Sequence, residues 1–256
     1  MNKGKLSTLQ VMSLGLLFAF IGILPIYKEM LNIGNVPLSD WLPVQIIYTG
    51  IQYMRVFFHE LSHCFFAWFH GHPSLPAFNF VHGGEVAIYS NTQYITIIFA
   101  IWLAMIYLAI QAREDKRLLV AIAVLFIFNA SISFTKHRYF VIIFMGPAIE
   151  PMIASYLLYR ALFDKAPRGD LERFLNAFFG FGIIISSFIR DISILKYRYK
   201  GGGLVGDFEQ IDSMYSSIDF NTPVIFLIII TVILFLFPFV LYCNKKTKTI
   251  GAVPDN

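Results

Sequence analysis

Residues 223–243 read PVIFLIIITVILFLFPFVLYC, an unbroken apolar run without a single charged side chain. A helix needs about 20 mostly apolar residues to cross the hydrocarbon core of a bilayer, so this run predicts a membrane-spanning helix. Similar runs recur along the whole chain and predict an all-α polytopic membrane protein with about six to seven transmembrane helices. The candidate spans are residues 11–27, 41–69, 94–112, 118–134, 139–162, 174–189 and 223–243.

The composition of the 256-residue chain favours the same class. Hydrophobic residues make up 57% of the chain and charged residues 14%, with a mean hydropathy of +0.66. Soluble domains carry about 25% charged residues, so this chain has too few to cover a water-facing surface. The net charge of +4 comes from short Lys and Arg clusters between apolar runs, and it does not indicate a nucleic-acid partner.

The chain shows no internal repeat and no separate soluble region, so residues 1–256 are predicted to form a single integral-membrane domain. One connection, residues 70–92, is rich in Pro and Gly and carries strand-like patches at residues 78–80 and 86–89. It predicts a small hairpin about His82-Gly83-Gly84. We expect a multi-pass protein of a bacterial-type cytoplasmic membrane, with the lipid bilayer as its surroundings.

Chemistry is concentrated in residues 57–63, which read FFHELSH. His59 and His63 are four residues apart, so on a helix both imidazoles lie on one face and can bind one tetrahedral zinc ion. Glu60 lies beside them and can take a proton from a water molecule that the zinc activates. Polar and ionisable groups are expensive inside an apolar helix and are functional candidates there. The pattern predicts a Zn²⁺ cofactor on His59 and His63, with Glu60 as the catalytic general base.

A catalytic zinc site of this kind needs a third protein ligand, and the residues leave two main candidates. Asp207 lies in the flexible stretch GGGLVGDFE and is the preferred ligand, whereas Glu150, in the middle of a candidate span, is the alternative. An ion pair with Arg190 is the simpler explanation of Asp191. His70 lies about 16 Å along the same helix from the first histidine, too far to share its metal unless the helix breaks.

Arg55 is a further charge within a candidate span, one helical turn before His59. Three roles remain open for it. It can pair with Glu150, hold a carbonyl group of the substrate, or extend its charged end to the membrane interface.

These features together resemble the site-2 protease family of intramembrane zinc metalloproteases. The resemblance covers roughly residues 45–210, and its strong element is the HELSH sequence of residues 59–63. Its weaker elements are the Gly-rich segment 70–89 and the sequence GPAIE of residues 146–150. It implies hydrolysis of a membrane-embedded or juxtamembrane peptide bond in a membrane-protein or peptide substrate.

The same resemblance implies that zinc binds His59 and His63, that Glu60 is the general base, and that a later Asp is the third ligand. In the family that Asp lies in an Asn-Pro-Asp-Gly or Leu-Asp-Gly motif, and Asp207 is the nearest match by order along the chain. Glu150 replaces the Asn that the family carries after Gly-Pro, and the residues around Asp207 depart from the motif. These differences suggest a divergent member.

The sequence leaves two other functions open. The imperfect third-ligand motif is also compatible with a membrane binding or scaffold protein that retains a metal site without hydrolysis. A metal-ion transporter is a less favoured alternative, because it needs several carboxylates along a path through the membrane and Glu150 alone is clearly placed within a span.

Overall fold

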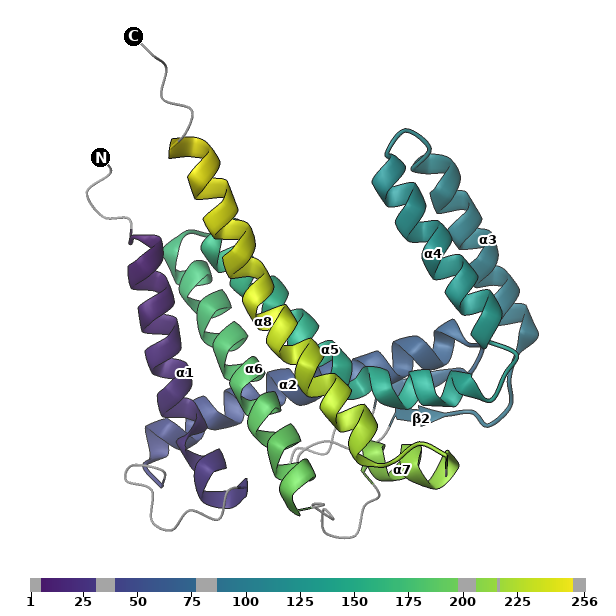
Figure 1. The fold of residues 1–256 in the computed structure, drawn as a ribbon, viewed down its shortest axis with the longest axis horizontal. Helices are drawn as coiled ribbons and strands as arrows, with labels where there is room; N and C mark the ends of the chain where they lie inside the picture. The colour runs from purple at the N-terminus through teal and green to yellow at the C-terminus, as the bar shows by residue number, and fades with distance from the viewer. Residues whose placement is uncertain (1–5, 31–39, 77–86, 198–205, 216, 251–256) are drawn as a thin grey trace. The chain divides into compact units, whose positions relative to one another are not determined.

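The computed structural model describes residues 6–30, 40–76, 87–197, 206–215 and 217–250. These residues form an all-α structure of eight helices with one short pair of strands (Figure 1). The elements in chain order are α1 (Thr8–Met30), α2 (Leu42–Phe69), β1 (Ser74–Pro76), β2 (Ala87–Tyr89), α3 (Ile95–Gln111), α4 (Lys116–Ile132), α5 (His137–Leu162), α6 (Asp170–Tyr197), α7 (Asp207–Met214) and α8 (Asn221–Ile250).

Each candidate span overlaps one helix, and at most two residues at an end of a span lie outside its helix. Helices satisfy all backbone hydrogen bonds within one segment, which is what an apolar surrounding demands. Within the described residues, three helices are long and apolar enough to cross a membrane, and two shorter helices are also apolar. The three are His137–Leu162, Asp170–Tyr197 and Asn221–Lys245, and the shorter two are Thr8–Leu24 and Ile95–Gln111.

The chain divides into two compact units, and helices α2 and α5 contribute residues to both. The first unit consists of Met1–Phe58 and Pro147–Asn256, and the second of His59–Gly146. The dividing points fall inside α2, between Phe58 and His59, and inside α5, between Gly146 and Pro147.

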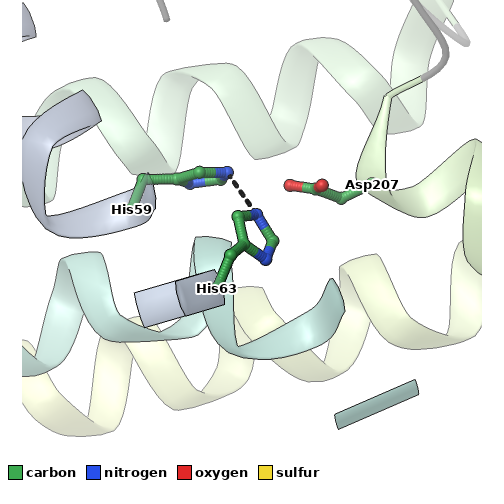
Figure 2. A group of neighbouring side chains, drawn as sticks. All are labelled: His59, His63 and Asp207. Atoms are coloured by element: carbon green, nitrogen blue, oxygen red, sulfur yellow. Dashed lines mark hydrogen bonds between the residues drawn. The ribbon is translucent and has the colours of Figure 1, made fainter. Parts of the chain in front are cut away.

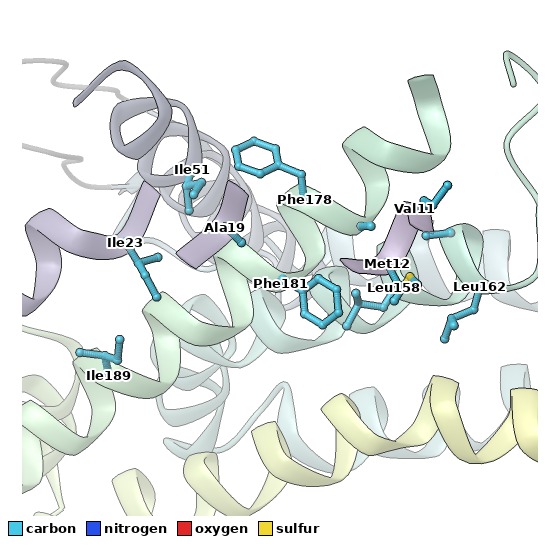
Figure 3. Close-up of a cluster of buried hydrophobic side chains, with 12 residues drawn as sticks. Val11, Met12, Ala19, Ile23, Ile51, Leu158, Leu162, Phe178, Phe181 and Ile189 are labelled. Atoms are coloured by element: carbon cyan, nitrogen blue, oxygen red, sulfur yellow. The ribbon is translucent and has the colours of Figure 1, made fainter. Parts of the chain in front are cut away.

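In the first unit, α1 packs along α6 and α6 packs against α8. The α1–α6 contact is close because Gly15 has no side chain: a Cβ atom added there would lie 2.6 Å from the Cβ of Ala177. A cluster of buried apolar side chains fills the space between α1, α2, α5 and α6 (Figure 3). Its members are Val11, Met12, Ala19, Ile23, Ile51, Leu158, Ala161, Leu162, Ala177, Phe178, Phe181 and Ile189.

A buried arginine fixes the start of α1 within this unit. Arg173, only 2% exposed, donates hydrogen bonds to the carbonyl of Leu6 (3.1 Å) and to the hydroxyl of Thr8 (3.0 Å). Its guanidinium also pairs with Asp164 and Asp170, at 3.1 and 3.3 Å. Asp170 in turn accepts a hydrogen bond from the backbone N–H of Leu6 at 2.7 Å. The charge of Arg173 is therefore compensated although its side chain is buried.

The second unit contains the predicted hairpin-like segment. Strands β1 and β2 pair antiparallel, with Ser74 opposite Tyr89 and Pro76 opposite Ala87. The first strand thus begins four residues earlier than the predicted patch at residues 78–80, and that patch and the expected turn at residues 82–84 lie outside the described residues.

Helices α3 and α4 pack against each other in the second unit and keep large apolar side chains at their surface. Leu103 is 68% exposed and Ile127 is 66% exposed, which is the surface a lipid-facing helix presents. The buried amide of Asn129, on α4, accepts a hydrogen bond from Trp102 of α3 and donates one to the carbonyl of Phe69 in α2, both at 2.7 Å. This amide ties the helical pair to the C-terminal end of α2.

Candidate metal centre

The two histidines of the HELSH sequence lie on one face of α2, as their spacing predicts. Their Nε2 atoms are 3.1 Å apart and their ring centroids 4.8 Å apart. Two nitrogens that bind one tetrahedral zinc ion at 2.0–2.1 Å lie about 3.4 Å from each other. The observed separation is close to that value, so the two imidazoles are already arranged as a pair of ligands.

Helix α5 fixes the orientation of the second histidine. The Nδ1 atom of His63, whose side chain is buried, lies 2.8 Å from the carbonyl oxygen of Ile142 and donates a hydrogen bond to it. A proton on Nδ1 leaves the lone pair on Nε2, the atom that faces His59. Metal-binding histidines are commonly held in this way, with the other ring nitrogen donating to a carbonyl.

Two further contacts bring α5 close to this turn of α2. The hydroxyl of Ser62 donates a hydrogen bond to the carbonyl of Met145 at 2.8 Å. Gly146 lies against the His63 ring, since a Cβ atom added to Gly146 would be 2.2 Å from Nε2 and 2.3 Å from Cε1. Any larger residue at position 146 would therefore displace the ring.

Glu60 is the third polar residue of the HELSH sequence, and it is buried, with 7% of its surface exposed. Its position next to His59 in α2 follows from the sequence. Its burial is the property that the structure adds.

Asp207 is the carboxylate that joins the two histidines. One ligand atom from each of His59, His63 and Asp207 lies within 4.8 Å of the other two (Figure 2). Asp207 is the first residue of α7. Nitrogen from two imidazoles and oxygen from one carboxylate form a donor set that zinc accepts, with a fourth position left for water or substrate. These residues are therefore placed to hold a metal ion.

Glu150, the alternative third ligand, has close protein partners of its own. Its carboxylate, 0% exposed, accepts hydrogen bonds from Arg190 at 2.6 Å and from the hydroxyl of Ser187 at 2.5 Å. Arg55 also pairs with Glu150, one of the three roles that the sequence left open: its Nη1 atom donates to the two carboxylate oxygens at 3.4 and 3.5 Å. Asp191 pairs with Arg190, as predicted, at 2.9 Å. These residues form one buried charge cluster on α2, α5 and α6.

The remaining histidines near the motif belong to a separate hydrogen-bond network. The Nδ1 atom of His70 accepts a hydrogen bond from the hydroxyl of Ser133 at 2.9 Å, and His72 accepts one from Arg138 at 3.1 Å. Burial, together with the neighbouring His72 and Arg138, lowers the pKa of His70 to about 4. Burial also lowers the pKa of His72. Both rings are therefore neutral at pH 7 and serve the packing at the end of α2.

Comparison of the chain with family models, with curated protein sequences and with solved structures finds no match. The chemistry that the donor set allows is metal-assisted activation of water or polarisation of a carbonyl group.

Sequence reasoning did not identify the supports of His63. Gly146 belongs to the Gly-Pro pair noted in the sequence, but its role in giving space to the His63 ring depends on how α5 packs against α2. A glycine inside a helix lowers the stability of the helix by about 1 kcal/mol relative to alanine. A glycine retained in an apolar helix therefore indicates that a neighbouring group packs closely against it. The carbonyl of Ile142 offers no such signal, because every residue carries one.

Proposed function

We propose that this chain is a multi-pass membrane zinc metallopeptidase, similar to the site-2 proteases, with six to seven transmembrane helices in a bacterial-type cytoplasmic membrane. The observation that carries the proposal is the pair of imidazole nitrogens 3.1 Å apart on α2, with the second ring fixed by Ile142. The substrate class is a peptide bond within or next to the membrane. The three long apolar helices support the membrane part of the proposal.

His59, His63 and Asp207 would hold the zinc ion, and the described donor set fits it. A bound zinc ion supplies Lewis acidity, which lowers the pKa of water and polarises a peptide carbonyl. Glu60 accepts the proton of the attacking water and returns it to the nitrogen that leaves. The Nδ1 hydrogen bond of His63 keeps its ring in the tautomer and orientation that binding requires.

Metal analysis of the purified protein tests the first half of the proposal. Wild-type protein should contain about one zinc ion per chain, the stoichiometry of a single catalytic site. The double variant His59→Ala, His63→Ala should contain none, and Asp207→Asn should bind zinc more weakly. Asp212→Asn, at an exposed position of the same helix α7, is the matched control and should keep full zinc content. A wild type without bound metal would reject the proposal.

Glu60→Gln tests the second half. This variant should keep zinc and lose peptide cleavage, because glutamine cannot accept the proton of the attacking water. Membrane proteomes of cells that express wild-type or Glu60→Gln protein should differ in the fragments of the substrate. Zinc binding with identical proteomes would favour the non-proteolytic metal-binding protein, and zinc transport into vesicles that depends on His59 would favour the transporter.

A further inference from the structure

The buried charge cluster contains two arginines that differ in how completely their donors are used. Arg190 uses all three nitrogens of its guanidinium: Nη1 donates to Glu150, while Nε and Nη2 donate to the Oδ1 atom of Asp191 at 3.0 and 2.9 Å. Both carboxylates are 0% exposed. Arg190 is therefore fully paired and serves the structure of the cluster.

Arg55 is held much more loosely. Its Nε atom donates to the side chain of Gln52 at 3.0 Å, and its Nη1 atom reaches Glu150 only at 3.4 and 3.5 Å. Among the described residues, its Nη2 atom donates no hydrogen bond. The side chain as a whole is 13% exposed.

The partners of Glu150 explain this difference. Glu150 already accepts short hydrogen bonds from Arg190 and Ser187, so its oxygens have little capacity left for a third donor. A guanidinium with unused N–H groups in an apolar helix is costly, since each unpaired polar group there lacks both water and a protein partner. An oxygen atom of a bound ligand would remove that cost.

The position of Arg55 on α2 indicates which ligand oxygen its guanidinium would bind. Arg55 and His59 are four residues apart in one unbroken helix, so they share a face and are separated by about 6 Å along the axis. In the proposed membrane span, Arg55 lies about 20 Å from either end of α2, which is too far for the phosphate of a lipid headgroup. Besides water, the oxygens that the proposed reaction brings to this level are those of a polypeptide backbone.

We propose that Arg55 is a catalytic residue that binds the carbonyl oxygen of the scissile peptide bond. This inference rests on the proposed function. As the oxygen of water bonds to the carbonyl carbon, the π electrons of the carbonyl move to its oxygen, and the free N–H groups of Arg55 stabilise that negative charge. Glu60 takes the proton of the water and delivers it to the nitrogen as the C–N bond breaks. Donors already in place where charge develops are the arrangement that stabilises such transition states.

A phosphinic dipeptide, whose tetrahedral anionic phosphinate replaces the peptide bond, provides a probe that requires no knowledge of the natural substrate. Its Kd is measured by calorimetry on the zinc-loaded, full-length protein. Arg55→Met should weaken binding by about 100-fold, the effect of losing one donor to a developing oxyanion. Arg55→Lys, which keeps the charge, should recover part of that loss. Arg160→Met, at an ion pair with Glu172 near the end of α5, is the control and should bind as wild type does.

Zinc content and acetohydroxamate binding are measured on the same samples, because acetohydroxamate is a small metal-binding compound without the phosphinate anion. Both should be unchanged in Arg55→Met, which would exclude a general loss of structure. If Arg55→Met loses zinc, the Kd of the phosphinic dipeptide is compared between Arg55→Lys and wild type instead, and that comparison tests the role of Arg55. Equal Kd values for the phosphinic dipeptide in zinc-loaded wild type and Arg55 variants would overturn the role proposed for Arg55 and leave the proposed function standing. A wild type that takes up no zinc overturns the proposed function and this inference together.

Discussion

One methyl group added at Gly146 tests how α5 holds the second histidine. In Gly146→Ala the new Cβ would lie 2.2 Å from Nε2 and 2.3 Å from Cε1 of His63, far inside the contact distance of carbon with either atom. The ring must move by about 1 Å, and its 2.8 Å hydrogen bond to Ile142 is then lost or bent. Losing a bond that orients a metal-binding histidine weakens metal affinity by about 10–100-fold. This range equals about 1.4–2.7 kcal/mol, similar to the cost of inserting a methyl group into a packed site.

The assay is a zinc competition titration with a chelator of known affinity on purified wild type and variants. Gly50→Ala is the matched control, because Gly50 also lies in a helix but a Cβ added there meets nothing within 4 Å. Gly50→Ala should bind zinc as wild type does, whereas Gly146→Ala should release zinc at a 10- to 100-fold lower chelator concentration. If the two variants bind zinc equally well, the reasoning that links α5 to His63 is refuted.

Three further predictions concern stability. The pKa of His70 falls from about 6.5 in the unfolded chain to about 4 in the folded protein, so its contribution to stability is complete above pH 6.5, and up to about 3 kcal/mol is lost as the pH falls to 4. Denaturation at stepped pH should show this loss in wild type and a smaller loss in His70→Asn, which keeps His72. Arg190→Met should lower the free energy of unfolding by about 3–5 kcal/mol, because buried carboxylates lose their cation, and Glu150→Gln added to it should restore part. Gly15→Ala should cost about 1–3 kcal/mol through its contact with Ala177. An unchanged melting temperature in Arg190→Met or Gly15→Ala would contradict the packing described for that residue.

Local patterns predicted much of the fold. The apolar run at residues 223–243 forms α8, and the four-residue spacing of the histidines in α2 brings their Nε2 atoms together. The strand-like patch predicted at residues 78–80 lies outside the described residues, and the strand that precedes it was not predicted. The observed strand Ser74–Pro76 contains a proline and only three residues, too few for a periodic signal.

The pairing of charges needed the structure. The sequence indicated Arg55 as one possible partner for Glu150, and that ion pair is present. The closer partner, Arg190, forty residues away in the chain, was not predicted. Side chains from three different helices meet in this cluster, and helical periodicity carries no information on which faces pack together. The neighbouring pair Arg190 and Asp191 was predicted correctly because it needed no such information.

The two boundaries between the compact units determine which parts of the candidate metal centre recombination could transfer together. Both histidines, the glutamate between them and the α5 carbonyl and glycine that support His63 lie in the continuous segment His59–Gly146. A recombination event with its two crossovers at the ends of this segment would transfer the motif and its supports in one piece. Asp207 and the charge cluster around Glu150 belong to the other unit and would stay behind, so the recipient chain would have to supply the third ligand.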